Sequence, residues 1–186
     1  TFPVSDPVAI ALGAQPLKAE ESINYSLGGV FRMGDLNVTV DGYRIDIDDR
    51  ILLSENLTGT AVTAFLAARG FPGVTGGRYF TNAVDTRTKG FDFVGRYDAD
   101  LGGAGSLGVT VGYNRGDTSI RSIAPNPEEL TQNGLNLLRI ARVEIGRLTV
   151  GPPEDKFILG SDWKIGDFTA QFTGTRYGEW QVLAAN

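Results

Sequence analysis

The stretch INYSLGGVFRMGDLNVTV, residues 23–40, decides the fold because it forms two alternating runs joined by a tight turn. In the first run Ile23, Tyr25, Leu27, Gly29 and Phe31 share one parity, and only Val30 breaks the polar parity between them. After Met33-Gly34-Asp35, the second run alternates Leu36, Val38 and Val40 with Asn37, Thr39 and Asp41. A period of two on both sides of a Gly-Asp turn predicts a β-hairpin with one apolar face.

The same pattern recurs toward the C-terminus. Residues 91–98 and 107–114 alternate on either side of the glycine-rich turn 102–105, and residues 157–165 and 168–175 flank the turn Ile165-Gly166-Asp167. With the first hairpin, these segments predict an all-β fold, an antiparallel meander of about six strands.

The apolar parity changes within the second segment, from Val38 and Val40 to Tyr43, Ile45 and Ile47. Such a change has two explanations. Gly42 can mark a β-bulge, in which one extra residue shifts every later side chain to the other face. Alternatively, the strand leaves a bilayer at this point, and the inside and outside of the sheet exchange their polarity.

The connections between the strands alternate between tight and very long. We expect a loose lead-in loop over residues 1–20 and long loops over 49–80 and 118–154. The first long loop contains a predicted helix at 61–69, ended by Gly70, and the second a helical turn at 128–130. Residues 137–150 fit either helix or strand. Two such loops are rare in soluble domains but usual on one side of an outer-membrane β-barrel.

Alternation alone fits two architectures. In a soluble β-sandwich the apolar rows would meet in a shared core, whereas in a transmembrane barrel they face lipid and the polar rows face the lumen. Phe31, Tyr97, Trp163 and Phe168 gather beside the short turns, where a barrel carries an interfacial aromatic girdle. The sequence therefore favours part of a large barrel over a soluble sandwich that binds carbohydrate or protein.

Composition excludes several functions for this segment. The net charge of −5 argues against a nucleic-acid partner, and the absence of cysteine and histidine removes disulfides, thiolate chemistry and the commonest general base. No residue stands out as catalytic, so we predict no enzyme, no cofactor and no metal site. Asp46, Asp48 and Asp49 lack the glycine and distal glutamate of a calcium loop, so they are interpreted as acidic residues where a strand enters an aqueous loop.

Three stretches resemble the β-barrel of TonB-dependent outer-membrane receptors. Residues 17–28, LKAEESINYSLG, are similar to the strand opening LKPE-(S/T)-x-N-Y-E-x-G. Residues 40–51, VDGYRIDIDDRI, are similar to D-Y-Y-R-I-D-I-x-D-R-I, and residues 82–92, NAVDTRTKGFD, to N-x-x-x-(A/T)-R-x-x-G-(V/F)-(E/D). Ala19 replaces the usual proline and Gly42 an aromatic residue. The three elements stand in the family's order and cover roughly residues 17–120.

The resemblance implies a barrel of about 22 strands with a plugged lumen, of which this chain supplies about a quarter. It implies an internal piece of the C-terminal half of an outer-membrane receptor in a Gram-negative bacterium. The implied substrate is large and scarce: a siderophore–iron chelate, cobalamin or an oligosaccharide. Implied partners are outer-membrane lipid, this small-molecule substrate, and the plug domain and TonB, contacted through parts of the receptor absent here. Unpaired edge strands also predict that the isolated segment self-associates.

Two groups of polar residues are candidates for ligand contact. Arg139, Arg142 and Arg147 form a basic group in the second long loop that can attract an anionic chelate or lipopolysaccharide phosphates, with a solvated loop face as the alternative. A second group can bind an anion or consist of lumen-facing residues that pair across strands; its members are Asn82, Arg87, Lys89 and Asp92.

Overall fold

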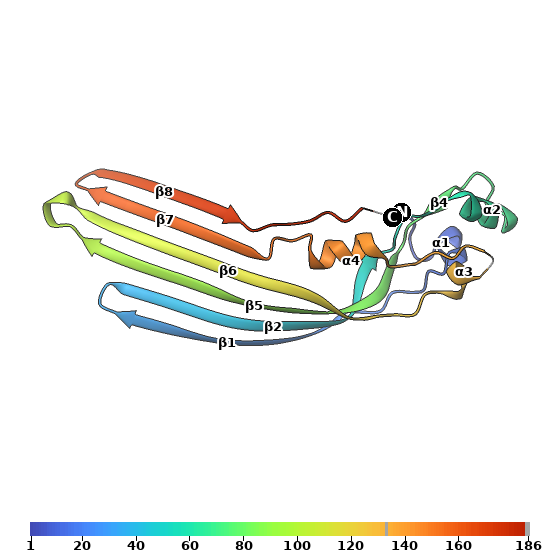
Figure 1. Cartoon of the computed structure of the whole chain (residues 1–186), viewed down its shortest axis with the longest axis horizontal. Helices are drawn as coiled ribbons and strands as arrows, with labels where there is room; N and C mark the ends of the chain where they lie inside the picture. The colour runs from blue at the N-terminus through green and yellow to red at the C-terminus, as the bar shows by residue number, and fades with distance from the viewer. Residues whose placement is uncertain (133, 185–186) are drawn as a thin grey trace.

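A computed structural model describes residues 1–132 and 134–184. Its body is one antiparallel sheet of six strands in the order β1-β2-β5-β6-β7-β8, so the predicted meander is confirmed (Figure 1). The strands are β1 (Glu21–Met33), β2 (Leu36–Leu53), β5 (Phe80–Asp100), β6 (Ser106–Ile123), β7 (Asp155–Ile165) and β8 (Phe168–Tyr177). The sheet is open: β1 and β8 are its edges.

Short turns join the strands at one end of the sheet, which we call the turn end. Gly34 and Gly166 take positive φ angles of 56° and 57° in the two Gly-Asp hairpins, a conformation that glycine adopts without strain. The β5–β6 connection contains the 3₁₀ helix η1 (Gly102–Ala104), and the Asp100 carboxylate accepts the Gly102 N–H at 2.8 Å. The opposite end of the sheet, the loop end, carries both long connections (Figure 1).

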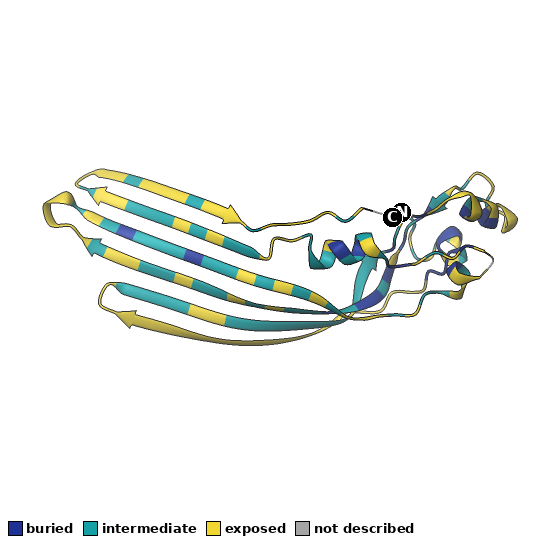
Figure 2. Ribbon diagram, viewed as in Figure 1, coloured by how far each residue is buried: buried dark blue, intermediate teal, exposed yellow. Residues whose placement is uncertain are grey.

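The long connections and the N-terminal segment fold into a small head at the loop end. It contains α1 (Pro7–Ala11), α2 (Thr60–Ala68), α3 (Glu128–Thr131), α4 (Arg142–Thr149) and the two-residue strands β3 (Leu57–Thr58) and β4 (Gly76–Gly77). Among the described residues, no helix is long and apolar enough to cross a membrane. Most buried side chains lie in this head (Figure 2), around a core that includes Leu12, Leu66, Tyr79 and Leu130.

The two faces of the sheet differ in composition. Side chains alternate between faces, and cross-strand partners share one. The register Val38↔Gly95↔Val111↔Leu159 therefore lies on one face, called here the aromatic face. Its other members near the turn end include Phe31, Phe91, Phe93, Tyr97, Val109, Tyr113, Phe157, Trp163, Phe168 and Phe172. The other face, called the opposite face, carries mainly Gly, Thr, Asn and charged residues over the same length.

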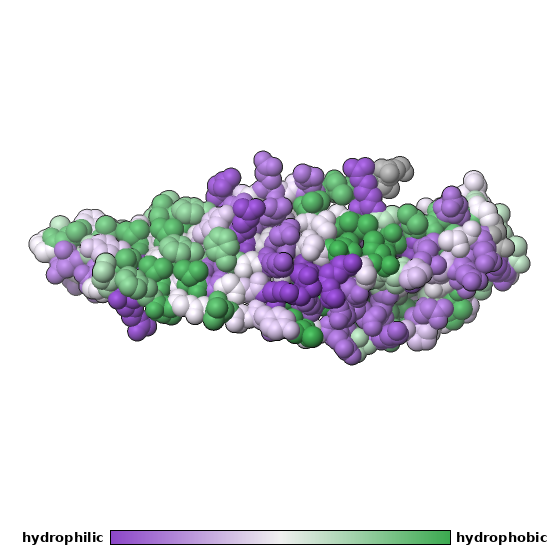
Figure 3. Space-filling model, turned by 60° about the horizontal axis from the view of Figure 1, so that its bottom comes forward, coloured by the Kyte–Doolittle hydropathy of each residue, from purple (hydrophilic) through white to green (hydrophobic). Residues whose placement is uncertain are grey.

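A soluble sandwich does not fit this arrangement, because the sheet is a single layer. Leu27 is 85% exposed and Phe172 60% exposed, so the aromatic face has no second layer packed on it. Figure 3 shows hydrophobic side chains gathered over the strands nearer the short turns and hydrophilic ones farther along. The apolar band runs from Phe91 to Ala99 on β5 and from Phe157 to Ile165 on β7 and is shorter on the other strands. Its longest rows approach the roughly 9–11 residues of a tilted transmembrane strand.

Three sequence-based expectations need correction. The register runs through Gly42 without a break, so the predicted bulge there is wrong; the irregularity lies between Ile47 and Arg50, where Asp49 has a φ of 52°. The reversal of polarity thus reflects the strand continuing past the apolar band. Residues 1–20 are also not a loose loop, because α1 buries Val8 and Ala9 in the head core. The loops themselves are shorter than expected, 54–79 and 124–154, because the strands extend beyond the apolar band.

Candidate functional site

A charged network crosses three strands on the opposite face near the turn end. Arg96 of β5 donates to the Asp162 carboxylate of β7, with Nη1 to Oδ1 at 3.0 Å, and to Asp98 with Nη2 to Oδ1 at 2.6 Å. The same guanidinium reaches the Thr110 hydroxyl of β6 at 3.2 Å. Gly108 lies beneath it, because a Cβ there would meet Arg96 Nη2 at 2.4 Å. Because Gly108 has no side chain, the Arg96 side chain can cross β6 and reach Asp162 on β7.

Farther toward the loop end, the same face carries neutral polar pairs and an aromatic ring. Thr88 and Thr118 join their hydroxyls at 2.8 Å, and Asn114 donates to Asp92. Tyr43 lies across two glycines: a Cβ on Gly90 would meet its hydroxyl at 2.4 Å and one on Gly116 at 3.0 Å. This face is therefore hydrophilic over the length of the apolar band, and its long side chains lie flat against glycines.

Helix α4 covers this face at the loop end. Its Ile145 and Leu148 pack against a cluster that includes Val84, and so does Ile120 of β6, two residues beyond Thr118 on the same face. The first long loop holds the helix in place. Glu55 accepts the N–H groups of Val143 and Glu144 at 3.1 and 3.2 Å, so it caps α4 from a distant part of the chain.

An ion-pair cluster strengthens this attachment. The Glu144 carboxylate, with its side chain only 6% exposed, pairs with Arg78 of the first loop and with Arg147 one turn later on α4, the latter at 2.6 Å. Burying a carboxylate is costly unless charged donors satisfy it, and here two guanidinium groups do so. The two long loops therefore form one packed unit rather than two separate flaps.

The head also contains a buried phenol. Burial raises the pKa of Tyr79 to about 12, and its hydroxyl donates to the Leu12 carbonyl at 2.9 Å. The Tyr79 N–H in turn donates to the Ser54 hydroxyl. These bonds tie the N-terminal segment to the start of β5, so the head core is built from segments far apart in the sequence.

A pocket of about 660 Å³ opens beside α4. Its walls are mostly apolar, and two arginines join them; the lining includes Ile123, Leu138, Arg139, Ile140, Arg142 and Ile145. A volume of this order suits a small molecule or part of a larger one. The pocket combines an apolar wall with cationic groups, which fits a ligand having both an apolar body and an anionic group.

The structure separates the three arginines singled out from the sequence. Arg139 is 7% exposed and donates to the carbonyls of Ala124 and Pro125, and burial lowers the pKa of its guanidinium. Arg142 lines the pocket with Arg139, whereas Arg147 pairs with Glu144. They do not form a single solvated patch, and ligand binding by them stays a prediction.

The structure also separates the members of the second predicted group, Asn82, Arg87, Lys89 and Asp92. Asn82 bonds to backbone groups of Lys18 and Asp49, and Asp92 lies on the opposite face with Asn114. Arg87 and Lys89 lie instead on the aromatic face, so their interpretation as residues of the polar, opposite face is wrong. Pairing across strands does hold for Arg87, which donates to Asp46 at 2.7 Å.

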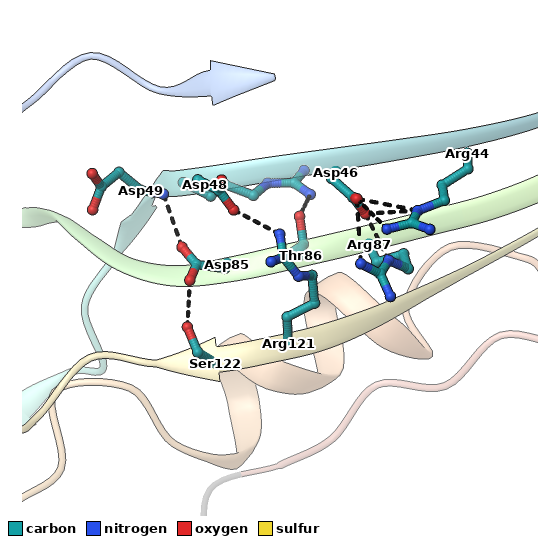
Figure 4. A network of polar contacts seen from close by, with 10 residues as sticks. Arg44, Asp46, Asp48, Asp49, Asp85, Thr86, Arg87, Arg121 and Ser122 are labelled. Atoms are coloured by element: carbon teal, nitrogen blue, oxygen red, sulfur yellow. Dashed lines mark hydrogen bonds and ion pairs between the residues drawn. The ribbon is translucent and has the colours of Figure 1, made fainter. Parts of the chain in front are cut away.

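On the aromatic face, charged residues replace apolar ones beyond Val40 and Phe91. Asp46 accepts hydrogen bonds from Arg87 and Arg44, which hold its pKa well below the usual range, and Asp48 pairs with Arg121 at 2.7 Å (Figure 4). In the same view Asp85 accepts from Ser122 and from the Asp49 N–H, so its pKa is also lowered. The acidic run at the end of β2 is thus engaged with arginines and neighbouring strands.

The comparison with protein families gives a match along nearly the whole chain. The family model described as "TonB dependent receptor-like, beta-barrel" matches residues 2–186. The chain belongs to the TonB-dependent receptor β-barrel family. No curated protein sequence gives a significant match to it.

Membership of this family indicates what each face of the sheet contacts. In a transmembrane barrel the aromatic face of this TonB-dependent receptor segment contacts lipid, and the opposite face lines the lumen. The Arg96 network and Tyr43 are then lumen residues, and α4 lies over the lumen side at the loop end. The family consists of outer-membrane receptors and transporters, which work with a plug domain and TonB, and is not enzymatic.

Sequence reasoning missed the residues that organise this receptor segment. Arg96, Asp98 and Asp162 stand on the polar parity of their strands, and charged residues at these positions were a usable signal. Their convergence over Gly108 depends on register, which a single sequence does not fix. Glu55 gave no signal, because it caps a helix that lies 88 residues away along the chain.

Proposed function

We propose that this segment is part of the wall and outer mouth of a receptor that captures a large, scarce substrate and imports it with energy supplied through TonB. The substrate classes are siderophore–iron chelates, cobalamin and oligosaccharides. In this proposal the protein resides in the outer membrane of a Gram-negative bacterium. Loops 54–79 and 124–154 are then extracellular, as long loops are in barrels of this kind.

One observation carries the proposal: a single sheet has an apolar band on one face, a hydrophilic opposite face and a packed head at its loop end. The head supports ligand capture, because Glu55, Arg78 and Glu144 hold both loops together beside a pocket of about 660 Å³. A preorganised pocket binds with less loss of conformational freedom than two mobile loops would.

The basic residues of the second loop are proposed to take different parts in ligand binding. Arg142 lines the pocket, and Arg147 is 57% exposed in its side chain while paired with Glu144. Arg139 is placed to stabilise the pocket wall rather than to meet a ligand first, because its guanidinium already donates to two backbone carbonyls.

The test is a binding and uptake experiment with the intact receptor that contains this segment. A ferric siderophore panel, cobalamin and maltooligosaccharides are offered to cells with and without TonB, and accumulation of labelled substrate is measured. We expect TonB-dependent uptake of one class, weakened by the double variant R142Q/R147Q. Arg69→Gln is the matched control, since Arg69 lies in the other loop and stacks on Phe65. Normal uptake without TonB would overturn the proposal.

A further inference from the structure

The segment that follows β8, residues 178–184 and called here the strap, returns from the edge of the sheet and runs alongside α4 (Figure 1). Two backbone hydrogen bonds of 2.8 Å hold it in place. The Gly178 N–H donates to the Asp155 carbonyl, and the Gln181 N–H donates to the carbonyl of Val150, the residue that ends α4. The strap is therefore attached both to the start of β7 and to the end of the helix.

Leu183 of the strap packs against the middle of α4. This leucine is half-buried, whereas Trp180 and Val182 of the same segment are exposed. A Cβ placed on Gly146 of α4 would lie 2.7 Å from both Cγ and Cδ1 of Leu183 and 3.0 Å from its Cβ. Because the Cβ of the leucine takes part in this contact, a change of its rotamer cannot make room for a larger residue at position 146. Leu183 therefore lies directly on the bare backbone of the helix.

This contact gives a reason for a glycine inside the helix. Glycine destabilises a helix interior relative to alanine, because the unfolded chain has more conformational freedom at that position. Gly146 is buried in the middle of α4, and it is the absence of its side chain that lets Leu183 approach. The helix thus carries a less stable residue at the position where the strap packs.

Leu183 also forms part of the wall of the pocket of about 660 Å³ beside α4. The other apolar walls include Ile123 at the end of β6, Leu138 in the second long loop and Ile145 on α4. Ile123 and Leu138 are exposed, so the pocket offers apolar surface to a ligand. Gly146 lies outside the described lining, and it acts on the pocket through Leu183.

We propose that Leu183, positioned by Gly146, is a specificity-determining residue of this pocket, and that it limits the size of the apolar part of an anionic ligand. The inference deepens the proposed function and rests on it, because that proposal takes the pocket as the ligand site. In a hydrophobic pocket a single methylene group changes the discrimination between two ligands roughly 10- to 200-fold. A leucine in the pocket wall therefore suffices to exclude a larger apolar body.

The experiment compares two aromatic carboxylates of equal charge and different size, 2-naphthoate and pyrene-1-carboxylate. Calorimetry measures their dissociation constants for the intact receptor in nanodiscs, after subtraction of the signal from empty nanodiscs. We expect the wild type to prefer 2-naphthoate. Leu183→Ala should shift the ratio of the two dissociation constants about tenfold toward the larger probe, and Leu183→Phe should shift it the other way.

Gly146→Ala tests how Leu183 is positioned. The new Cβ displaces Leu183, so the ratio should change roughly threefold or more in the wild-type background. In the Leu183→Ala background the same substitution should leave the ratio unchanged, because no leucine is left to displace. If Gly146 affected only the stability of the helix, the ratio would stay the same in both backgrounds, and the positioning role would be wrong.

Val182→Ala is the matched control, since Val182 belongs to the same strap, is exposed and lies outside the described lining of the pocket. It should leave the ratio unchanged. An equal ratio in the wild type, Leu183→Ala and Leu183→Phe overturns the proposal, as does equal weakening of both probes by Leu183→Ala. Failure of both probes to bind the wild type also overturns it.

The outcome is independent of the uptake experiment, because binding is measured without TonB and without transport. A receptor that shows the shift in ratio but imports none of the offered substrates contradicts the proposed function alone. A receptor that imports a substrate but shows no shift contradicts the role of Leu183 alone.

Discussion

Arg96 on β5 forms an ion pair with Asp162 on β7, two strands away, and its side chain crosses the bare backbone of Gly108 on β6 to do so. The distance from Nη1 to Oδ1 is 3.0 Å, and a second branch of the guanidinium holds Asp98. One residue therefore connects three strands on the lumen face. The connection depends on register, because Asp98, Gly108 and Asp162 are cross-strand partners in one row.

Replacing Gly108 by alanine is expected to break this bridge. The new Cβ would meet Arg96 Nη2 at 2.4 Å and the Asp162 carboxylate at 2.7 Å, so the guanidinium must move off the row. Since both side chains are well exposed, we expect only a small loss in the free energy of unfolding. Gly112→Ala is the control, because its Cβ meets only Ile158 at an ordinary 3.5 Å. Urea unfolding of the intact receptor in detergent measures both variants, and an equal effect of the two contradicts the prediction.

Two neighbouring residues of β8 test which face meets lipid. Phe172 lies on the aromatic face and Thr173 on the opposite one, and both are exposed in the open sheet. Phe172→Arg should make the free energy of folding into a bilayer less favourable by about 2–4 kcal/mol, the cost of arginine near the midplane. Thr173→Arg faces the aqueous lumen and should cost little. Folding into vesicles, followed by gel mobility with and without heating, measures the difference. A reversed order of the two variants would assign the faces the other way.

Much of this sheet follows from the sequence alone. The alternation around Gly34 and Gly166 predicts both hairpins, and the helix predicted at 61–69 is confirmed as α2, Thr60–Ala68. These features are local, since a period of two, a Gly-Asp turn and a glycine after a helix each act within a few residues. The helical turn at 128–130 and helix α4 in the ambiguous segment 137–150 depend more on tertiary contacts.

The rest depends on contacts between distant residues. The head core joins Leu12, Leu66 and Leu130, and no local pattern predicts that the N-terminal segment packs there. Beyond the apolar band the outer face of the strands meets water and carries polar residues. In the sequence this change of polarity at Gly42 looks the same as the change that a bulge would cause. The prediction that Arg87 and Lys89 face the lumen is wrong for the same reason, because alternation alone assigns every polar residue of a strand to the lumen.

Removing the distant cap of α4 should loosen that helix without unfolding the sheet. Glu55→Ala deletes the carboxylate that accepts the N–H groups of Val143 and Glu144, at a cost of about 1 kcal/mol to the helix. Hydrogen exchange over residues 142–149 should then accelerate about fivefold, while exchange in β5 and β6 stays unchanged. Glu128→Ala is the control, since Glu128 bonds only within α3 and its following residue Gln132. Unchanged exchange in α4 would contradict the prediction and show that the apolar contacts of the helix hold it in place without the Glu55 cap.

Acid should weaken the charged cluster beyond the apolar band. Arg87 and Arg44 donate to Asp46 and hold its pKa below the usual value near 4, so the unfolded state binds this proton more readily than the folded state. The stabilisation is complete above pH about 4 and disappears as the pH falls through the lowered folded pKa. Asp46→Asn should therefore reduce the stability of the receptor at pH 7 and flatten its decline below pH 4. Asp167→Asn, in an exposed turn, is the control. Parallel acid-unfolding curves for the wild type and Asp46→Asn would contradict this.

The isolated segment is expected to self-associate in plain buffer. Both edge strands, β1 and β8, present unpaired backbone N–H and C=O groups, and every residue of β1 is exposed. The aromatic face adds exposed Leu27, Phe31, Phe168 and Phe172, which detergent or lipid covers in a barrel. Light scattering should therefore show large particles without detergent and small, uniform ones with it. Leu27→Lys together with Phe172→Lys should reduce association more than Ser26→Lys with Thr173→Lys, because only the first pair disrupts the apolar face. A lone monomer of the unmodified segment in plain buffer would mean that its edges and apolar face are covered from within.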